Sequence, residues 1–163
     1  MKKTNAARIL ESQGVPYETR EYEVDADDLS APKVAQAIGL PPEQVFKTLV
    51  ARGDKTGVLL ACLPGSAELN LKALAKASGN KTVELAAVKD IQNLTGYIRG
   101  GVSPVGTKKA YPVYLDSSAG RWPVIAVSAG VRGCQALLAP ADLARVVRAV
   151  MAGITTGDVI APS

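Results

Sequence analysis

The feature that most constrains the fold is a pair of neighbouring apolar segments with a turn-forming sequence between them. Residues 45–51 and 58–63 each have the composition of a β-strand, and residues 52–57 combine two glycines with an aspartate. Two strands joined by so short a loop run antiparallel. The pattern therefore favours a mixed sheet over a doubly wound sheet of parallel strands.

The rest of the chain alternates irregularly between helical and extended patterns. Apolar periodicity and helix-ending glycines predict helices over 5–13, 32–39, 69–78 and 88–94, and a last one from Pro140 that includes Val150. Strands are predicted over 17–24, 112–116, 122–128 and 135–138. We expect an α/β (α+β) domain over residues 1–153, with helices outside a mixed sheet, and a loose tail over 154–163.

The chain has no histidine, which restricts its chemistry more than any other feature of its composition. A Ser-His-Asp triad, a Cys-His dyad and a histidine metal site are all excluded. Cys62 and Cys134 fit no metal or redox spacing, and Cys62 is expected to be a buried thiol. The net charge of +4 permits an anionic partner without requiring one.

The sequence shows no sign of a membrane span or a secretory signal. No apolar run approaches the ~20 residues that a membrane helix needs. The basic N-terminus leads into an amphipathic helix rather than an unbroken apolar stretch. We therefore expect a cytoplasmic protein with no membrane partner.

The least ordinary segment is residues 95–106, which holds four glycines and a proline between two apolar stretches. Glycine permits positive φ and a close approach of the backbone to a ligand. Successive free amides in such a loop can hold a carbonyl oxygen that becomes an oxyanion. An ordinary connecting turn is the alternative. The spacing of the glycines fits no nucleotide-binding motif.

Two further segments carry a positively charged side chain in or next to a predicted strand. Lys47 alternates with Leu49 and Ala51, so it points at the core or into a pocket, or else lies near a strand edge and reaches water. Residues 128–133 place Arg132 between two glycines after a strand. Arginine suits phosphate or carboxylate, although a hairpin turn with an exposed arginine explains the segment equally well.

Taken together, these segments resemble the YbaK family of aminoacyl-tRNA deacylases, which is related to the editing domain of bacterial prolyl-tRNA synthetases. The matching pieces are residues 45–49, 69–72, 95–97, 100–109 and 128–133, in that order. The resemblance implies a mixed, barrel-like sheet surrounded by helices. It also implies hydrolysis of the ester that joins a wrong amino acid, typically cysteine, to the 3′ end of tRNA(Pro).

The resemblance also implies which residues form the site. Lys47 and Gly100 match the key positions, with Gly101 beside them. We expect the following residues to contact the substrate: Tyr22, Ala31, Thr48, Val102, Ser103, Pro104, Ser128, Gly130, Arg132 and Gln135. No metal and no cofactor is expected. The implied partners are the aminoacyl-tRNA 3′ end and prolyl-tRNA synthetase, and no DNA.

The chain departs from the family pattern at two positions that line the implied amino-acid pocket. Ala31 or Pro32 stands where the cysteine-specific members carry an aromatic residue, and Gln135 stands where they carry an acid. Cysteine, alanine and serine therefore all remain open as the amino acid removed. The alternative function is a binding module of the same fold that recognises an aminoacyl-tRNA or a synthetase without chemistry.

Overall fold

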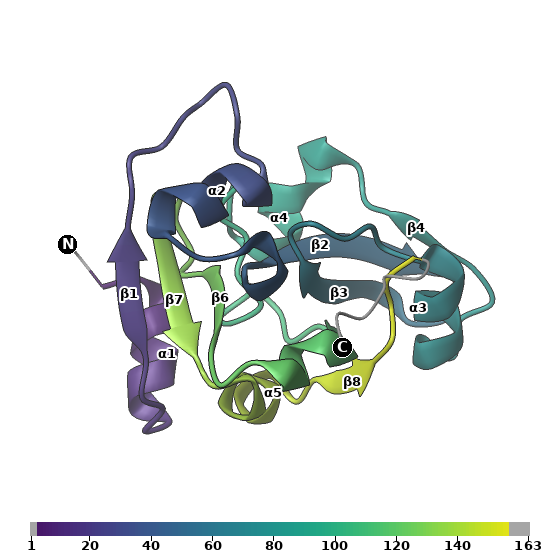
Figure 1. Ribbon diagram of the computed structural model, residues 1–163. Coiled ribbons are helices and arrows are strands. Elements are labelled where there is room, and N and C mark those ends of the chain that lie inside the picture. The colour runs from purple at the N-terminus through teal and green to yellow at the C-terminus, as the bar shows by residue number, and fades with distance from the viewer. Residues whose placement is uncertain (1–2, 157–163) are drawn as a thin grey trace.

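The structure is a computed structural model that describes residues 3–156. Five helices and eight strands follow one another along the chain (Figure 1). The helices are α1 (Asn5–Ser12), α2 (Ala31–Ile38), α3 (Leu71–Ser78), α4 (Ile91–Thr95) and α5 (Pro140–Val147), with short 3-10 turns η1 (Pro42–Gln44), η2 (Val88–Asp90) and η3 (Ser117–Arg121). The strands are β1 (Glu18–Glu21), β2 (Phe46–Gly53), β3 (Gly57–Pro64), β4 (Val83–Leu85), β5 (Val113–Asp116), β6 (Ile125–Ser128), β7 (Cys134–Leu138) and β8 (Val150–Ala152).

The predicted hairpin is the centre of a five-stranded sheet in the order β4-β2-β3-β5-β8. β2 and β3 are antiparallel from Phe46↔Pro64 to Gly53↔Gly57, whereas β3–β5 and β5–β8 are parallel. The expected mixed sheet is therefore confirmed. The predicted strands near 17–24, 122–128 and 135–138 form a second, antiparallel sheet in the order β1-β7-β6.

The two sheets lie side by side and do not close into a barrel (Figure 1). A single bridge, Val45↔Ala126, joins the start of β2 to β6. Within the described residues β4 and β8 stand at the edges of their sheet with one neighbour each, so the mixed sheet is right and its barrel-like closure is not. Both edge strands are only three residues long.

Helix α2 covers the junction between the two sheets. It ends at Gly39, whose φ of +75° lets the amide cap the last turn, as the sequence predicted. Its inner face joins a small apolar cluster with two residues of the three-stranded sheet and with the residue just before β2: Ala35, Ile38, Val45, Ala126 and Leu137. This cluster fixes α2 above the start of β2, where the site described below is found.

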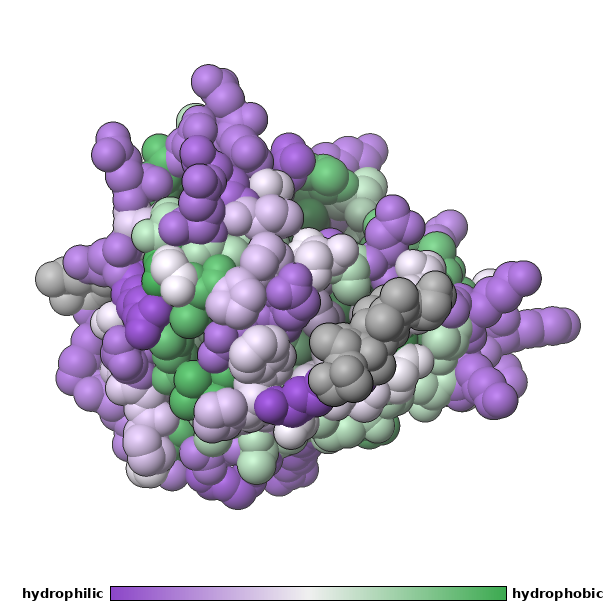
Figure 2. All heavy atoms as spheres, in the orientation of Figure 1, coloured by the Kyte–Doolittle hydropathy of each residue, from purple (hydrophilic) through white to green (hydrophobic). Residues whose placement is uncertain are grey.

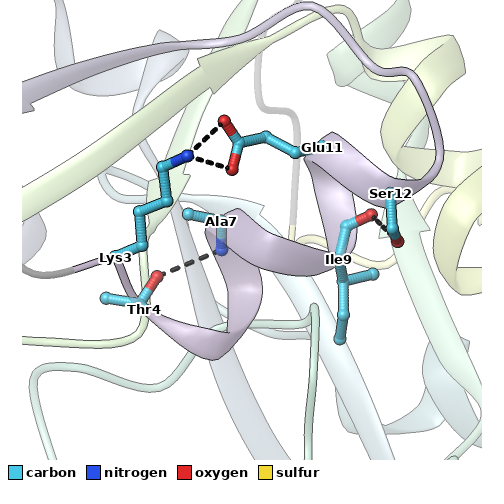
Figure 3. A network of polar contacts seen from close by, with 6 residues as sticks. All are labelled: Lys3, Thr4, Ala7, Ile9, Glu11 and Ser12. Atoms are coloured by element: carbon cyan, nitrogen blue, oxygen red, sulfur yellow. Dashed lines mark hydrogen bonds and ion pairs between the residues drawn. The ribbon is translucent and has the colours of Figure 1, made fainter.

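Helix α1 illustrates how closely local sequence sets an element (Figure 3). The Thr4 hydroxyl accepts a hydrogen bond of 3.1 Å from the Ala7 amide, which caps the first turn. Ser12 donates to the carbonyl of Ile9 within the last turn. The Lys3–Glu11 ion pair of 2.8 Å is exposed and therefore adds little stability.

The structure corrects two predictions about apolar residues, and it contains one strand that was not predicted. Val150 does not belong to the last helix: α5 ends at Arg148 with φ +54°, and Val150 pairs with Tyr114 as part of β8. Leu71 contributes to the apolar periodicity that predicted its helix, yet it is 38 % exposed in the first turn of α3. β4 was not predicted, since three residues show no alternation.

The first residues of the expected tail are packed. Ile154 is fully buried in the cluster between α3 and the five-stranded sheet, and Thr155 bridges to Leu69. Residues 157–163 of that tail lie outside the described part of the chain. Among residues 3–156, no helix has the length and apolar character needed to cross a bilayer.

Candidate active site

A cavity of about 320 Å³ opens between α2, the first half of β2, the η2–α4 segment and the glycine loop. Its lining contains seven of the residues predicted from the sequence: Ala31, Lys47, Thr48, Gly100, Val102, Ser128 and Gln135. Apolar side chains from β4 and η2, Leu85 and Val88, stand exposed at its rim. Figure 2 shows hydrophobic residues reaching the surface over the α4 segment of Figure 1.

Lys47 lies on the face of β2 that the alternation predicted, with Leu49 and Ala51. It is half-buried in the cavity wall, and its Nζ donates to the Ala67 carbonyl at 2.7 Å and to the Gly65 carbonyl at 3.4 Å. Burial lowers the pKa of Lys47, and the nearby Glu68 carboxylate acts in the opposite direction. The ammonium has three donors, so one remains for a ligand.

Thr48 points away from Lys47, toward the main core. Its hydroxyl lies 3.5 Å from the Cys62 sulfur on β3. Cys62 is fully buried, as predicted, and burial raises the pKa of its thiol to about 12. At neutral pH this thiol is protonated, which makes it a packing residue and a poor nucleophile.

Gly100 occupies a backbone conformation that needs glycine. Its φ is +85°, and a Cβ there would come within 3.2 Å of Arg132 Nε and 3.3 Å of Leu29 Cδ1. The chain therefore passes between the β6–β7 turn and the segment before α2 with no room for a side chain. Its backbone faces the cavity directly.

Gly101 makes close contacts within the protein. Its amide donates to the Ile98 carbonyl at 2.9 Å, which closes a turn and leaves no free donor. A Cβ at Gly101 would lie 3.2 Å from the backbone of Val131 and Arg132, so the residue lets two loops pack closely. It lines neither the main cavity nor the smaller one beside it.

Gly100 and Val102, on either side of Gly101, do line the cavity. Neither amide has an acceptor among the residues that the structure describes. Two unpaired N–H groups at a cavity wall can stabilise negative charge that develops on a bound carbonyl oxygen. Of the two predicted glycines, Gly100 lines the cavity and Gly101 does not.

Three residues that were predicted to bind substrate hold the loop in place. Ser103 is fully buried, and its hydroxyl accepts from the Val105 amide at 3.1 Å. Pro104 is buried beside it. Gly130 has φ +103° and lies against the Tyr97 ring, where a Cβ would be 3.0 Å from a ring carbon. None of the three lines the cavity.

Sequence reasoning missed the part that Tyr97 plays in this support. Its hydroxyl donates to the Val105 carbonyl at 2.6 Å and lies 3.1 Å from the Gly106 carbonyl, so it ties the far end of the loop to its beginning. The ring is 9 % exposed, and burial raises its pKa. The sequence did contain a signal for this role, namely an aromatic residue inside a glycine-rich segment.

Tyr22 and Arg132 lie on the other side of Gly100. Together with Gly100 they line a smaller cavity of about 30 Å³, separate from the main one. Arg132 Nε donates to the Arg99 carbonyl at 2.8 Å, which braces the loop just before Gly100. Arg99 itself lines the main cavity and was not predicted, although it directly precedes the glycine pair.

The cavity is cationic. Lys47 and Arg99 line it, and its lining includes no aspartate or glutamate. Within the described residues no group of three potential ligands could hold a metal ion. The wall therefore offers positive charge, unpaired backbone amides and a few neutral polar groups, which together suit an ester or another polarised carbonyl.

The model of the aminoacyl-tRNA editing domain matches residues 27–146, which include every residue that lines the main cavity. The chain belongs to the aminoacyl-tRNA editing domain family. This editing domain is 49 % identical over 156 residues to an Enterococcus faecalis protein named "Putative Cys-tRNA(Pro)/Cys-tRNA(Cys) deacylase EbsC", with 96 % of this chain and 95 % of that protein covered.

Two other similar proteins carry names that refer to proline tRNA or its synthetase. The editing domain is 30 % identical over 111 residues to the proline–tRNA ligase of Pelotomaculum thermopropionicum, with 63 % of this chain but only 19 % of the ligase covered. A solved structure titled "Crystal structure of a putative trans-editing enzyme for prolyl tRNA synthetase" superposes with a TM-score of 0.82 at 28 % identity, covering 96 % and 100 % of the chains. The mixed fold is thereby confirmed.

Proposed function

We propose that this editing domain is a free-standing deacylase that removes a wrongly attached small amino acid, cysteine first among the candidates, from tRNA(Pro). The observation that carries the proposal is one cavity that combines the Lys47 side chain with the unpaired amides of Gly100 and Val102. The names of the relatives, a Cys-tRNA(Pro) deacylase and proline–tRNA ligases, support the choice of tRNA.

The proposed chemistry uses the backbone to stabilise charge. When the ester carbonyl is attacked, its oxygen becomes an oxyanion, and the amides of Gly100 and Val102 donate to it. Such donors are fixed before the reaction, because Tyr97 and Ser103 hold the loop. Each donor of this kind typically contributes about 10²–10³-fold in rate.

Lys47 supplies the charge that the amides lack. Its ammonium keeps two backbone acceptors and turns its third N–H toward the ester or the terminal phosphate. In this proposal it serves as a donor rather than a base, since the ammonium form can donate to both carbonyl oxygens and still offer a third N–H. The chain then needs no histidine.

The nucleophile comes from the substrate or from water. With a cysteinyl ester, the thiol sulfur forms a bond to the carbonyl carbon while the carbon–oxygen bond to the tRNA breaks. The thiol proton ends on the tRNA hydroxyl, and the amino acid leaves as a thiolactone. Attack within one molecule is a large advantage. Other amino acids require water, which yields the free acid.

A deacylation assay tests the proposal. Purified protein is incubated with tRNA(Pro) charged with cysteine, alanine or serine, and the remaining ester is measured over time. We expect loss of at least one ester well above the uncatalysed rate, and no loss of correctly charged Pro-tRNA(Pro). If all three esters stay intact while tRNA still binds in a salt-dependent manner, the protein is a binding module and not an enzyme.

A second assay addresses the synthetase. Adding prolyl-tRNA synthetase to the same reaction is expected to raise selectivity for tRNA(Pro), because one small domain with few aromatic residues has little means of reading bases. Equal rates on tRNA(Pro) and on an unrelated tRNA, with and without the synthetase, would remove that enzyme as a partner.

A further inference from the structure

A tight turn at the end of β3 receives the ammonium of Lys47. Residues 64–67 form a four-residue turn, which is closed by a 3.0 Å hydrogen bond from the Ala67 amide to the Pro64 carbonyl. Lys47 Nζ donates to the Ala67 carbonyl at 2.7 Å and more weakly to the Gly65 carbonyl at 3.4 Å. Because a half-buried ammonium needs acceptors, this turn decides where the charge of Lys47 lies in the cavity wall.

Gly65 is the residue at which this turn meets two other parts of the cavity. Its amide donates at 2.7 Å to the carbonyl of Val45, which lines the cavity just before β2. A Cβ on Gly65 would overlap the Cβ of Ala31, which is the first residue of α2 and also lines the cavity. The φ of Gly65 is not positive, so it is contact with α2, and not backbone strain, that excludes a side chain here.

A side chain at Gly65 would have to displace either α2 or the turn. α2 is held from its other end, because Ile38 is buried against the three-stranded sheet and its carbonyl accepts from Arg20 Nη1 at 2.9 Å. The turn has Ser66 exposed on its outer side and therefore has room to move. Since close-packed interiors transmit such an overlap to the side that can yield, the turn would shift and carry its carbonyls away from Lys47.

We propose that Gly65 is a positioning residue for Lys47: because it carries no side chain, the first residue of α2 packs onto the turn and keeps the ammonium in the cavity wall. This inference rests on the proposed function, in which that ammonium faces the ester. Gly65 itself does not line the cavity, so it acts on the reaction only through Lys47. Its replacement should therefore matter while Lys47 is present and have no effect once Lys47 is removed.

A double-mutant cycle on deacylation tests this relation. Gly65→Ala is expected to lower kcat/KM by about tenfold or more, because small displacements of a group at a reaction site have effects of this size. In the Lys47→Met background the same change should alter kcat/KM by less than about twofold, since residues that act as one unit are not additive. Equal fold-losses in the two backgrounds would show that Gly65 supports the fold in general, which overturns the proposal.

Two further variants separate the contact with α2 from a general loss of stability. Ala31→Gly removes the Cβ that Gly65→Ala would meet, so the double variant should return to within about threefold of Ala31→Gly alone. Gly53→Ala is the matched control, because its Cβ would overlap the Asn80 side chain at a position that also has no positive φ and lies outside the cavity lining. It should lower the melting temperature without lowering the rate. No rescue by Ala31→Gly, or an equal rate loss in Gly53→Ala, contradicts the proposal.

The Lys47 ammonium can also be followed by NMR without any substrate. In protein labelled with ¹³C at lysine Cε, the signal that is missing from Lys47→Arg reports the titration of Lys47. Burial lowers the pKa of Lys47 in the wild-type protein. Release of the ammonium toward water in Gly65→Ala should move this pKa upward toward its ordinary value, and Ala31→Gly in the same chain should reverse the change.

The NMR titration keeps this inference separate from the deacylase proposal. An unchanged titration of Lys47 in Gly65→Ala overturns the role of Gly65, even if the protein cleaves esters. A shift that Ala31→Gly reverses supports it. If the titration behaves in this way and the wild-type protein cleaves no ester, Gly65 still positions Lys47, and the failure belongs to the proposed catalysis alone.

Discussion

The two cationic and polar walls of the cavity are built in different ways. On the β2 wall, Lys47 is a long side chain whose ammonium already donates to the carbonyls of Ala67 and Gly65. On the opposite wall, the amides of Gly100 and Val102 are part of the backbone and have no acceptor among the described residues. One wall must share its donors with the protein, and the other keeps them unpaired.

This difference indicates how much each wall is expected to contribute to catalysis. A backbone amide in a braced loop loses almost no freedom when a ligand arrives, so its contribution is fixed in advance. A lysine has about 2 kcal/mol of rotamer entropy to lose, and its contacts to carbonyls have already fixed much of it. We therefore expect deacylation to be more sensitive to changes in the loop than to changes at Lys47. Four experiments, in decreasing order of their expected effect, test this.

The largest effect is expected for Gly100→Ala. The added Cβ meets Arg132 and Leu29 and forces the loop to move, so kcat/KM for deacylation should fall by about 10²–10³-fold. Gly96→Ala is the matched control, since Gly96 has a similar φ of +83° but a Cβ there would make only an ordinary contact, with Lys108 Cβ at 3.8 Å. Both variants should lose about 1 kcal/mol of stability from the positive φ. Equal activity losses would mean that strain alone, and not the loop position, is responsible.

Replacement of Lys47 should have the next largest effect. Lys47→Met removes the charge and should lower kcat/KM about 100-fold, whereas Lys47→Arg restores charge without the same reach and should recover part of the rate. Lys76→Met, on the exposed face of α3, should behave like the wild type. A Lys47→Met enzyme with normal steady-state kinetics would take the lysine out of the mechanism and leave the loop alone.

A smaller effect is expected for Tyr97→Phe, which removes the hydroxyl that ties the glycine loop together. Stability should fall by about 1 kcal/mol, and deacylation by several-fold, because the amides of the loop are less well fixed. Tyr111→Phe removes an equivalent 2.6 Å hydrogen bond to the Leu94 carbonyl and should cost similar stability with no loss of rate. Matching rates for the two variants, measured beside urea unfolding, would show that the loop needs no such brace.

The smallest effect is expected from blocking the protein's thiols. Cys62 and Cys134 are both buried, and burial raises the pKa of each, that of Cys62 to about 12. Iodoacetamide at pH 8 should label neither thiol in the folded protein and leave deacylation unchanged. Mass spectrometry checks the labelling, and full labelling in urea is the control. Rapid inactivation would point to a protein thiol in the chemistry.

Local sequence was a good guide to elements and to residues with special backbone demands. The hairpin over 45–63, the Thr4 cap and the helix end at Gly39 follow from turn, cap and φ preferences that act over a few residues. β4 and β8 escaped prediction because three-residue strands exist only through their neighbours. Val150 continued a helical pattern in sequence, yet it found a strand partner in Tyr114.

The sequence predicted which residues lie at the site better than it predicted what each residue does there. Lys47, Gly100 and Gln135 stood out in the sequence and do share one cavity. Gly101 and Val102 differ because the Gly101 amide donates to the Ile98 carbonyl, whereas the Val102 amide has no acceptor among the described residues. Ser103 and Gly130 turned out to brace the loop, because Val105 and Tyr97 lie beside them.

The sequence by itself determined the hairpin, the absence of histidine chemistry and the glycine positions, since these depend on residue identity and on contacts between near neighbours. Only the tertiary structure decided that α2, β2, the glycine loop and β7 enclose one cavity, that its lining carries no carboxylate, and that the Lys47 ammonium meets two carbonyls of the turn after β3. Those properties depend on which groups from distant segments meet, and on which hydrogen bonds form when they do.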